Sequence, residues 1–302
     1  MTDNSNPNGM ILIYKESGIT SFDVVKKIKK LYNTGKVGHT GTLDPLAEGL
    51  LCILVGQSVK ASEMLLNHDK TYYAGIRFGI RTDTEDITGA VKETSSYIPS
   101  NEETEKVIMS FKGKYYQTPP MYSAKKVNGK KLYEYARQGI DIEREKCELE
   151  ISDIEIDKER SVFPDWYFKV TCSKGTYIRT LCDDIGLKLG TFGTMTSLKR
   201  LRCGNFKLDD AYKLEDLENL SFEERIMRLT PSEKLFDYPE IRLSGFYTKL
   251  CLNGCEIYQK KINTSYPLGT DVKIYSDTNK FLGTGKVLSY ENGEAVKLVT
   301  RL

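Results

Sequence analysis

Residues 38–49 read GHTGTLDPLAEG, and the interpretation of this glycine-punctuated stretch decides that of the whole chain. Asp44 stands directly before Pro45, whose ring pushes the preceding residue out of the helical region and suits a first helical position. The pattern predicts a loop that runs into a helix, with Asp44 as the N-cap. The nearby glycines support a second interpretation, in which a partner's backbone approaches closely and the carboxylate points outward to act in catalysis.

Strands and helices are predicted on both sides of this stretch, from apolar spacing and capping residues. The predicted strands are residues 10–14, 71–78, 149–156 and 166–172. The predicted helices are one that Ser21 caps and that ends near Asn33 and Gly35, one that Ser100 and Glu103 open as a capping box, and residues 132–138, 181–189 and 221–229. No fixed period recurs, so a repeat architecture is disfavoured.

The C-terminal part of the chain has a different pattern. Thr230-Pro231 and Asp237-Tyr238-Pro239 are typical of a boundary. Beyond it, short β-rich runs are separated by Gly, Asn and Asp: residues 272–275, 281–287 and 295–299. We therefore expect one domain over residues 9–230 and a small β domain over residues 236–302, near the lower size limit for independent folding.

The composition is typical of a globular protein and excludes several classes. Of the 302 residues, 39% are hydrophobic and 28% charged. No stretch approaches the roughly 20 apolar residues that a membrane span needs, and the N-terminus lacks the pattern of a signal sequence. The seven cysteines are scattered without a C-x-x-C pair, which fits a reducing compartment. We expect a cytoplasmic protein with no membrane partner.

The residue types present limit the chemistry. The chain has two histidines, His39 and His68, which excludes a multi-histidine metal site; His68 is expected to be structural. Residues 283–286 (GTGK) lack the spacing of a phosphate-binding loop, and a dinucleotide fingerprint is missing. No metal and no nucleotide cofactor is expected, so catalysis is predicted to rest on Asp, Glu, Tyr, Lys or Arg.

Positive charge is concentrated in two segments, although 44 Lys and Arg against 42 Asp and Glu give a net charge of only +2. The two basic clusters are Lys125, Lys126, Lys130 and Lys131, and Lys199, Arg200, Arg202 and Lys207. Because acidic residues gather elsewhere, the sequence predicts a basic face on a nearly neutral body. Either cluster alone is more typical of a solvated helix face.

Several blocks, all in one order, resemble a known family. Residues 41–49 (GTLDPLAEG) are similar to the catalytic motif of the bacterial tRNA pseudouridine synthases that act on uridine 55 of the T-arm loop. The other similar blocks are residues 15–18 (KESG), 70–72 (KTY), 81–84 (RTDT), 121–124 (MYSA), 131–137 (KLYEYAR) and 172–179 (CSKGTYIR). The resemblance covers residues 9–210 and implies the α+β pseudouridine synthase fold, an antiparallel-rich mixed sheet with flanking helices. The C-terminal part is diffusely similar to the small RNA-binding PUA domain that this family often carries.

The resemblance implies that Asp44 is the nucleophile. The reaction breaks the N1 glycosidic bond of uridine, turns the uracil and rejoins it through C5, without redox change, water or cofactor. Attack on the ribose C1′, addition to the uracil C6 and assistance to elimination toward a glycal all remain open. Arg179 would orient the carboxylate and favour its ionised form by lowering its pKa. Without the resemblance, an Arg at this position is more typical of a surface ion pair.

The remaining site residues are also implied by the resemblance. The uridine must leave its stack to be reached; Tyr72 would lie against the uracil and accept or relay the C5 proton, while Tyr177 and Leu198 line the pocket. His39 would insert into the T-loop in place of the flipped base. Lys15, with the two basic clusters, would contact phosphates. Without the resemblance, the tyrosines are interpreted as packing residues, and a satisfied loop histidine is an equally good interpretation of His39.

Glu48 departs from the family pattern, in which a small residue more often follows the Ala. An acid is favourable in a first helical turn, but one close to the RNA backbone is expected to weaken affinity. We predict a monomeric isomerase whose partner is the T-arm stem-loop of tRNA. One alternative is a tRNA-binding or tRNA-folding module, against which Asp44 beside Arg179 argues. The other is a carboxylate-based glycosidase, which needs a second catalytic carboxyl that no motif supplies.

Overall fold

The computed structural model describes residues 6–127 and 129–302, and within them the largest sheet has nine strands. Its order is β1-β3-β12-β4-β11-β10-β7, with β2 on β3 and β13 on β12. The strands are β1 (Gly9–Lys15), β2 (Val37–His39), β3 (Glu48–Val55), β4 (Lys70–Phe78), β7 (Gly113–Gln117), β10 (Cys147–Ile156), β11 (Asp165–Cys172), β12 (Gly193–Cys203) and β13 (Phe206–Lys207). All pairs are antiparallel except β3 with β12, which confirms the predicted antiparallel-rich α+β fold.

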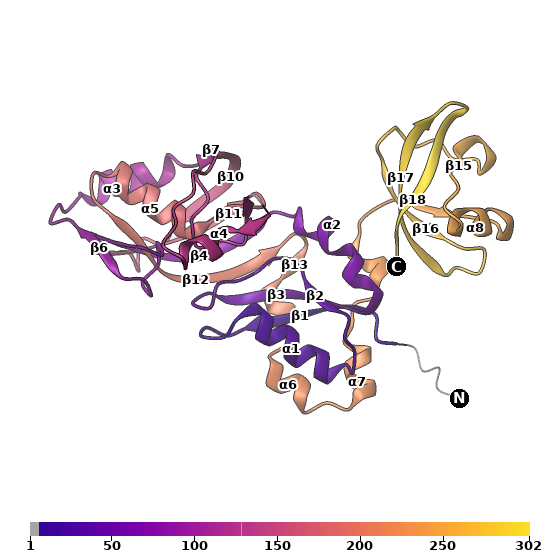
Figure 1. Cartoon of the computed structure of the whole chain (residues 1–302), viewed down its shortest axis with the longest axis horizontal. Helices are drawn as coiled ribbons and strands as arrows, with labels where there is room; N and C mark the ends of the chain where they lie inside the picture. The colour runs from indigo at the N-terminus through magenta and orange to yellow at the C-terminus, as the bar shows by residue number, and fades with distance from the viewer. Residues whose placement is uncertain (1–5, 128) are drawn as a thin grey trace.

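Helices cover the two halves of this sheet separately (Figure 1). The helices are α1 (Ser21–Leu31), α2 (Ser62–Leu66), α3 (Asn101–Met109), α4 (Leu132–Ala136), α5 (Ile178–Lys188), α6 (Leu214–Glu218) and α7 (Phe222–Met227), with the 3-10 turns η1 (Gly56–Ala61), η2 (Leu208–Asp210) and η3 (Ser232–Leu235). α1, α6 and the residues after α7 pack on β1 and β3, whereas α3 and α5 pack on β4, β10 and β11. Two short hairpins form separate two-stranded sheets: β5 (Ile80–Thr82) with β6 (Val91–Thr94), and β8 (Lys126–Val127) with β9 (Lys130–Lys131).

The two halves meet at a short parallel contact between β3 and β12. Only two residue pairs are in register there, Glu48 with Lys199 and Gly49 with Arg200. A Cβ atom at Gly49 would lie 2.5 Å from the carbonyl oxygen of Arg200, and its φ of +101° is one that side chains rarely adopt. Glycine is therefore required at this position. The GTLDPLA segment ends here, so the junction fixes its position between the two halves.

The helix predicted after Pro45 is wrong. Residues 44–47 form a turn, in which the Ala47 amide donates to the Asp44 carbonyl at 3.1 Å, and β3 begins at Glu48. The sequence EGLLCILV is apolar at consecutive positions, as in a strand buried on both faces, and it pairs with both β1 and β12. Because this pairing outweighs the local proline signal, Asp44 caps no helix and Glu48 lies in a strand.

Ser21 is not the N-cap of α1, which is a second correction. Thr20 caps the helix and forms a capping box with Asp23. The Ser21 hydroxyl instead accepts from the Leu43 amide at 2.9 Å and donates to the Leu43 carbonyl at 3.0 Å. The residue that resembles a cap therefore holds the loop next to Asp44.

The predicted strands are confirmed, and one irregularity has a clear cause. Leu149 and Ile151 are two positions apart, as are Ile154 and Ile156, but Ile151 and Ile154 are three positions apart. The register of β10 against β11 shifts between Ile151 and Asp153, which is a bulge. The bulge returns the second pair to the buried face.

The other helices match their predictions with small differences. Ser100 and Ser221 are N-caps, as predicted. Glu103 does not complete a capping box; its carboxylate accepts a hydrogen bond from the Tyr97 hydroxyl instead. α5 begins at Ile178, three residues before the predicted start, so Arg179 lies in its first turn.

The C-terminal part forms a separate five-stranded sheet, coloured yellow and orange in Figure 1. Its strands, in the order β14-β16-β17-β18-β15, are β14 (Glu240–Arg242), β15 (Ile257–Tyr258), β16 (Asp271–Tyr275), β17 (Phe281–Tyr290) and β18 (Gly293–Arg301), with the 3-10 turn η4 (Gln259–Lys261) after β15. The helix α8 (Gly245–Leu252) was not predicted. Phe281 and Leu302 pack against the apolar cluster around Met10 and Leu50, so the two sheets share contacts. The division at residues 230 and 236 stays a prediction.

No helix in the described part of the chain is long and apolar enough to span a bilayer.

Candidate active site

Asp44 and Arg179 meet where the GTLDPLA segment faces the first turn of α5. The Arg179 Nε lies 3.0 Å from the Asp44 Oδ2. The Arg179 side chain is 6% exposed, whereas that of Asp44 is 36% exposed. A buried guanidinium therefore holds from behind a carboxylate that is open to solvent on one side.

The remaining donors of Arg179 are bound by a second layer of acceptors. Nη1 donates to the Thr84 carbonyl at 3.2 Å, and Nη2 donates to the Tyr122 carbonyl at 2.9 Å. Nη1 also lies 3.9 Å from the Oδ2 of buried Asp86. These contacts use the forked shape of the guanidinium and fix its direction toward Asp44.

Sequence reasoning missed Asp86. Its Oδ1 accepts hydrogen bonds from the hydroxyls of Thr84 and Thr88 and from the Thr88 amide. A signal was present in the order Thr84-Glu85-Asp86-Ile87-Thr88, because hydroxyl residues two positions on either side of an Asp are typical of a carboxylate fixed in a turn. The similar block RTDT ends at Thr84, two residues before Asp86.

Burial raises the pKa of Asp44 above its ordinary value. The positive charge of Arg179 opposes this rise, while the carboxylate of Asp86 adds to it. The guanidinium does lower this pKa, as expected, but the net shift is upward because the loss of water outweighs the ion pair. Once ionised, such a carboxylate is a stronger base than one in water.

Tyr72 and Leu198 lie in one apolar cluster with Leu43, which precedes Asp44 by one residue. Tyr72 is 8% exposed, and burial raises its pKa to about 12. Tyr177 immediately precedes α5, and both its amide and its carbonyl are bound by the Gln117 side chain. These three predicted pocket residues therefore come from β4, β12 and the start of α5.

Lys15 and Arg200 are placed where they cannot meet phosphates, which corrects two predictions. Lys15 is fully buried, and its Nζ donates to the carbonyls of Glu16, Ile19 and Pro45 at 3.0, 2.7 and 3.4 Å. Burial lowers its pKa to about 8. Arg200 is 2% exposed and donates to the carbonyls of Leu50 at 2.7 Å and Gly41 at 3.1 Å. Both cations instead brace the segment that carries Asp44.

Of the two basic clusters, the one at the β8–β9 hairpin reaches solvent more fully. Lys125, Lys126 and Lys130 are exposed, and the ammonium of Lys130 lies 5.6 Å from the centre of the Tyr135 ring. Lys131 is partly exposed. This cluster therefore forms the predicted basic surface better than the cluster around Arg200.

His39 and Glu48 lie at the two ends of the segment. His39 is half-buried in β2, and its Nδ1 accepts from the Gly41 amide at 3.3 Å. Burial and the charge of Arg200 lower its pKa, which favours the neutral ring at pH 7. Glu48 forms an ion pair with Lys199 at 3.3 Å and accepts from the Tyr14 hydroxyl at 2.8 Å. Its charge is therefore partly balanced within the protein.

Among residues 6–127 and 129–302, no three or more His, Cys, Asp or Glu side chains gather in a way that could hold a metal ion.

Comparison with known proteins shows which family this chain resembles. The profile described as "TruB family pseudouridylate synthase (N terminal domain)" matches residues 29–178, and that of the "tRNA pseudouridylate synthase B C-terminal domain" matches residues 179–236. A protein of Clostridium kluyveri named tRNA pseudouridine synthase B is 43% identical over 92% of this chain and 95% of its own length. The protein of the same name from Clostridium tetani is 42% identical over 97% and 99%.

The fold has solved relatives. A crystal structure of a Cbf5-Nop10-Gar1 complex contains a chain that matches 98% of this chain and 85% of its own length, with a TM-score of 0.73 and 24% identity. At that identity the likeness supports the fold alone. The arrangement of Asp44 and Arg179, the two profiles and the close relatives agree, and the chain belongs to the TruB family of pseudouridylate synthases.

Proposed function

We propose that this protein converts uridine 55 in the T-arm loop of tRNA into pseudouridine, with Asp44 as the nucleophile. The observation that carries the proposal is the ion pair between a partly exposed Asp44 and a buried Arg179. The family and the names of the relatives support the reaction and the tRNA substrate. The experiment that tests it measures release of the uracil C5 hydrogen from an unmodified tRNA transcript.

The reaction is an isomerisation, so its atoms balance without a co-reactant. The bond from N1 to C1′ breaks, a bond from C5 to C1′ forms, C5 loses a proton and N1 gains one. Asp44 enters as the anion and can attack C1′, add to C6 or assist elimination. Arg179 keeps the carboxylate aimed during this step, because its other donors are already bound to the carbonyls of Thr84 and Tyr122.

Tyr72 can act on the C5 proton only as a relay. With a pKa of about 12, its phenol is protonated at neutral pH, so a phenolate acceptor is scarce. A relay receives one proton as it passes on its own. The same ring offers an apolar surface for the unstacked uracil.

Replacing Tyr72 by Phe is expected to slow turnover about 100-fold while tRNA binding is kept. The ring and its packing remain, and only the hydroxyl is lost. Release of the C5 hydrogen under single-turnover conditions measures the rate, and filter binding measures affinity. Tyr73→Phe is the matched control. Tyr73 is the next residue of β4, and its hydroxyl donates a hydrogen bond to Asp157. An unchanged rate in Tyr72→Phe would exclude the phenol as a relay.

We propose that the T-arm lies across the β8–β9 hairpin and the Asp44 segment. The exposed lysines of the hairpin are suited to phosphates. A neutral His39 at the edge of the same segment is suited to stacking in the space left by the flipped base. Recognition and chemistry would then use separate side chains.

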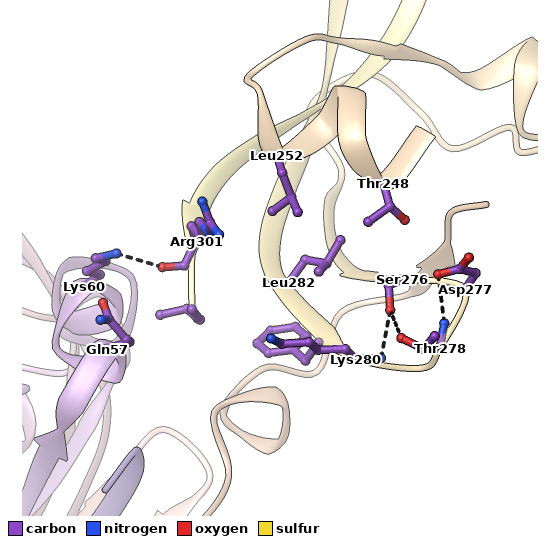
Figure 2. Close-up of a pocket in the computed structure, with 12 residues that line it drawn as sticks. Gln57, Lys60, Thr248, Leu252, Ser276, Asp277, Thr278, Lys280, Leu282 and Arg301 are labelled. Atoms are coloured by element: carbon purple, nitrogen blue, oxygen red, sulfur yellow. Dashed lines mark hydrogen bonds between the residues drawn. The ribbon is translucent and has the colours of Figure 1, made fainter. Parts of the chain in front are cut away.

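The C-terminal sheet contributes a second surface for RNA in this proposal. A groove of about 610 Å³ lies between η1 and the C-terminal sheet. Figure 2 shows Lys60 of η1 in contact with Arg301 of the C-terminal part, where its Nζ donates to the Arg301 carbonyl at 3.2 Å. Lys280, Leu252, Leu282 and one acidic residue, Asp277, also line the groove. Cations around a partly apolar floor are suited to a phosphate backbone with its sugars, so we assign this groove to tRNA outside the T-arm.

Replacing Lys280 and Arg301 together by Ala is expected to weaken binding of full-length tRNA and to reduce its salt dependence. Loss of two phosphate contacts lowers the slope of log K against log salt by about 1 to 2. Affinity for the isolated T-arm stem-loop should stay unchanged. Lys92→Ala with Lys106→Ala is the charge-matched control at exposed positions of β6 and α3. An unchanged slope for full-length tRNA would contradict the assignment of the groove.

A further inference from the structure

Glu85 has an unusual backbone conformation at a position next to the candidate active site. Its φ is +64°, in the left-handed region that favours glycine. It stands between Thr84, whose carbonyl binds Arg179, and Asp86, whose carboxylate faces the same guanidinium. Because this one residue links the two acceptors, its conformation sets the direction from which both reach Arg179.

The neighbouring strand β12 holds Glu85 in this conformation. The Met195 amide donates to the Glu85 carbonyl at 3.1 Å, and the Ile87 amide donates to the Met195 carbonyl at 2.9 Å. A residue that is costly in this region persists only where surrounding structure fixes it, and such positions cluster at functional sites.

The side chain of Glu85 makes a separate contact with α5. The Thr180 Oγ1 donates to the Glu85 Oε2 at 2.5 Å, and Thr180 directly follows Arg179 in the chain. Glu85 therefore touches both elements that hold the guanidinium: the turn that supplies its acceptors and the helix that carries it.

The charges around this carboxyl are mixed. The titratable groups that face Glu85 or act on its immediate partners are Arg179, Cys182, Asp183 and Asp184 of α5, Arg81 of β5, Tyr115 of β7 and Asp86 of its own turn. Burial raises the pKa of Glu85 to about 7, and the carboxylates of Asp183 and Asp184 add to the rise. The hydrogen bond from Thr180 and the charge of Arg179 oppose it.

We propose that Glu85 is a positioning residue for Arg179 and that its ionisation strengthens the hold of Arg179 on Asp44. The inference rests on the proposed function. Its reason is reciprocal coupling: Arg179 stabilises the anion of Glu85, so the anion stabilises Arg179 in its place by the same free energy. Turnover therefore rises with pH as Glu85 loses its proton. This rise adds to the one that the ionisation of Asp44 causes.

The same ionisation costs stability. A carboxyl whose pKa is raised by folding favours the folded state most at low pH, and that contribution is lost as pH rises through its folded pKa. Here the loss falls mainly between the ordinary Glu value of about 4.3 and the folded value of about 7. Glu85 therefore lowers the stability of the folded protein at neutral pH while it supports the position of Arg179.

Glu85→Gln tests the inference by single-turnover rates on unmodified tRNA between pH 5.5 and 8.5. Glutamine keeps the shape and can still accept from Thr180, but it cannot ionise. We expect a rate within about twofold of the wild type at pH 6 and about fivefold lower at pH 8.5, with unchanged tRNA affinity. The thermal midpoint of the variant should rise relative to the wild type as pH increases from 5 to 8.

Thr180 provides the second pair of variants. Thr180→Val removes the hydrogen bond that lowers the pKa of Glu85, so the upper step of the rate profile should move to higher pH. Thr180→Ser keeps the hydroxyl and should leave that step in place. Superimposed pH profiles for the wild type and Glu85→Gln would overturn the inference alone. A wild type that releases no C5 hydrogen from tRNA would instead overturn the proposed function.

Discussion

Asp44→Asn is expected to lower turnover by at least about 1,000-fold, the scale of losing a nucleophile, while tRNA binding survives. Asparagine fits the same space and can still accept from Arg179, but it carries no negative charge. The buried Arg179 then faces a neutral amide in place of its ion pair, although its contacts with Thr84 and Tyr122 remain. Release of the C5 hydrogen and filter binding measure the two effects separately.

The control for this experiment is Asp209→Asn, which removes an exposed carboxylate from η2. Its rate and affinity should match the wild type. Turnover that survives in Asp44→Asn would refute the nucleophile. If the wild type binds tRNA but shows no turnover, the alternative of a tRNA-binding or tRNA-folding module would be favoured.

Arg179→Lys is expected to have the second largest effect, a loss of about 100-fold in turnover. Lysine keeps the charge, but a single ammonium cannot reach Asp44 and the carbonyls of Thr84 and Tyr122 in the same fork geometry. A buried acceptor left without its donor also costs stability, about 1–3 kcal/mol. Single-turnover kinetics and urea unfolding measure the two consequences.

Arg77→Lys is the matched control for Arg179→Lys. Arg77 also makes two hydrogen bonds to one carboxylate, that of Asp165, but its side chain is 43% exposed. A solvent-exposed ion pair contributes little to stability. The rate and the stability of Arg77→Lys should therefore stay near those of the wild type. Equal behaviour of the two variants would contradict the orienting role of Arg179.

Most elements of the fold were predictable because their signals are local. The strand β11 and the caps Ser100 and Ser221 depend on nearby residues, and each is observed. The helix after Pro45 was wrong because β3 gains more from pairing with β1 and β12 than the proline signal provides. A preference of one or two residues yields to hydrogen bonds with strands that are distant in sequence.

The candidate site was predictable to a different extent. The motif resemblance pointed to Asp44 and Arg179, and the structure places them 3.0 Å apart. It did not point to Asp86. The charge pattern grouped Arg200 with the basic surface, although this side chain is buried. The sequence does not show whether the partner of a basic residue is a phosphate or a backbone carbonyl.

The sequence by itself determined the family, the secondary structure of most of the chain and the residue types available for catalysis, because motif order and apolar periodicity are carried by neighbouring residues. Only the tertiary structure decided which charges are buried and what surrounds them. In the folded protein, Lys15 donates to the Pro45 carbonyl in the Asp44 segment, and burial raises the pKa of Asp44. Glu85 accepts a hydrogen bond from Thr180. These properties arise from desolvation and from contacts between distant segments, and both exist only once the chain has packed.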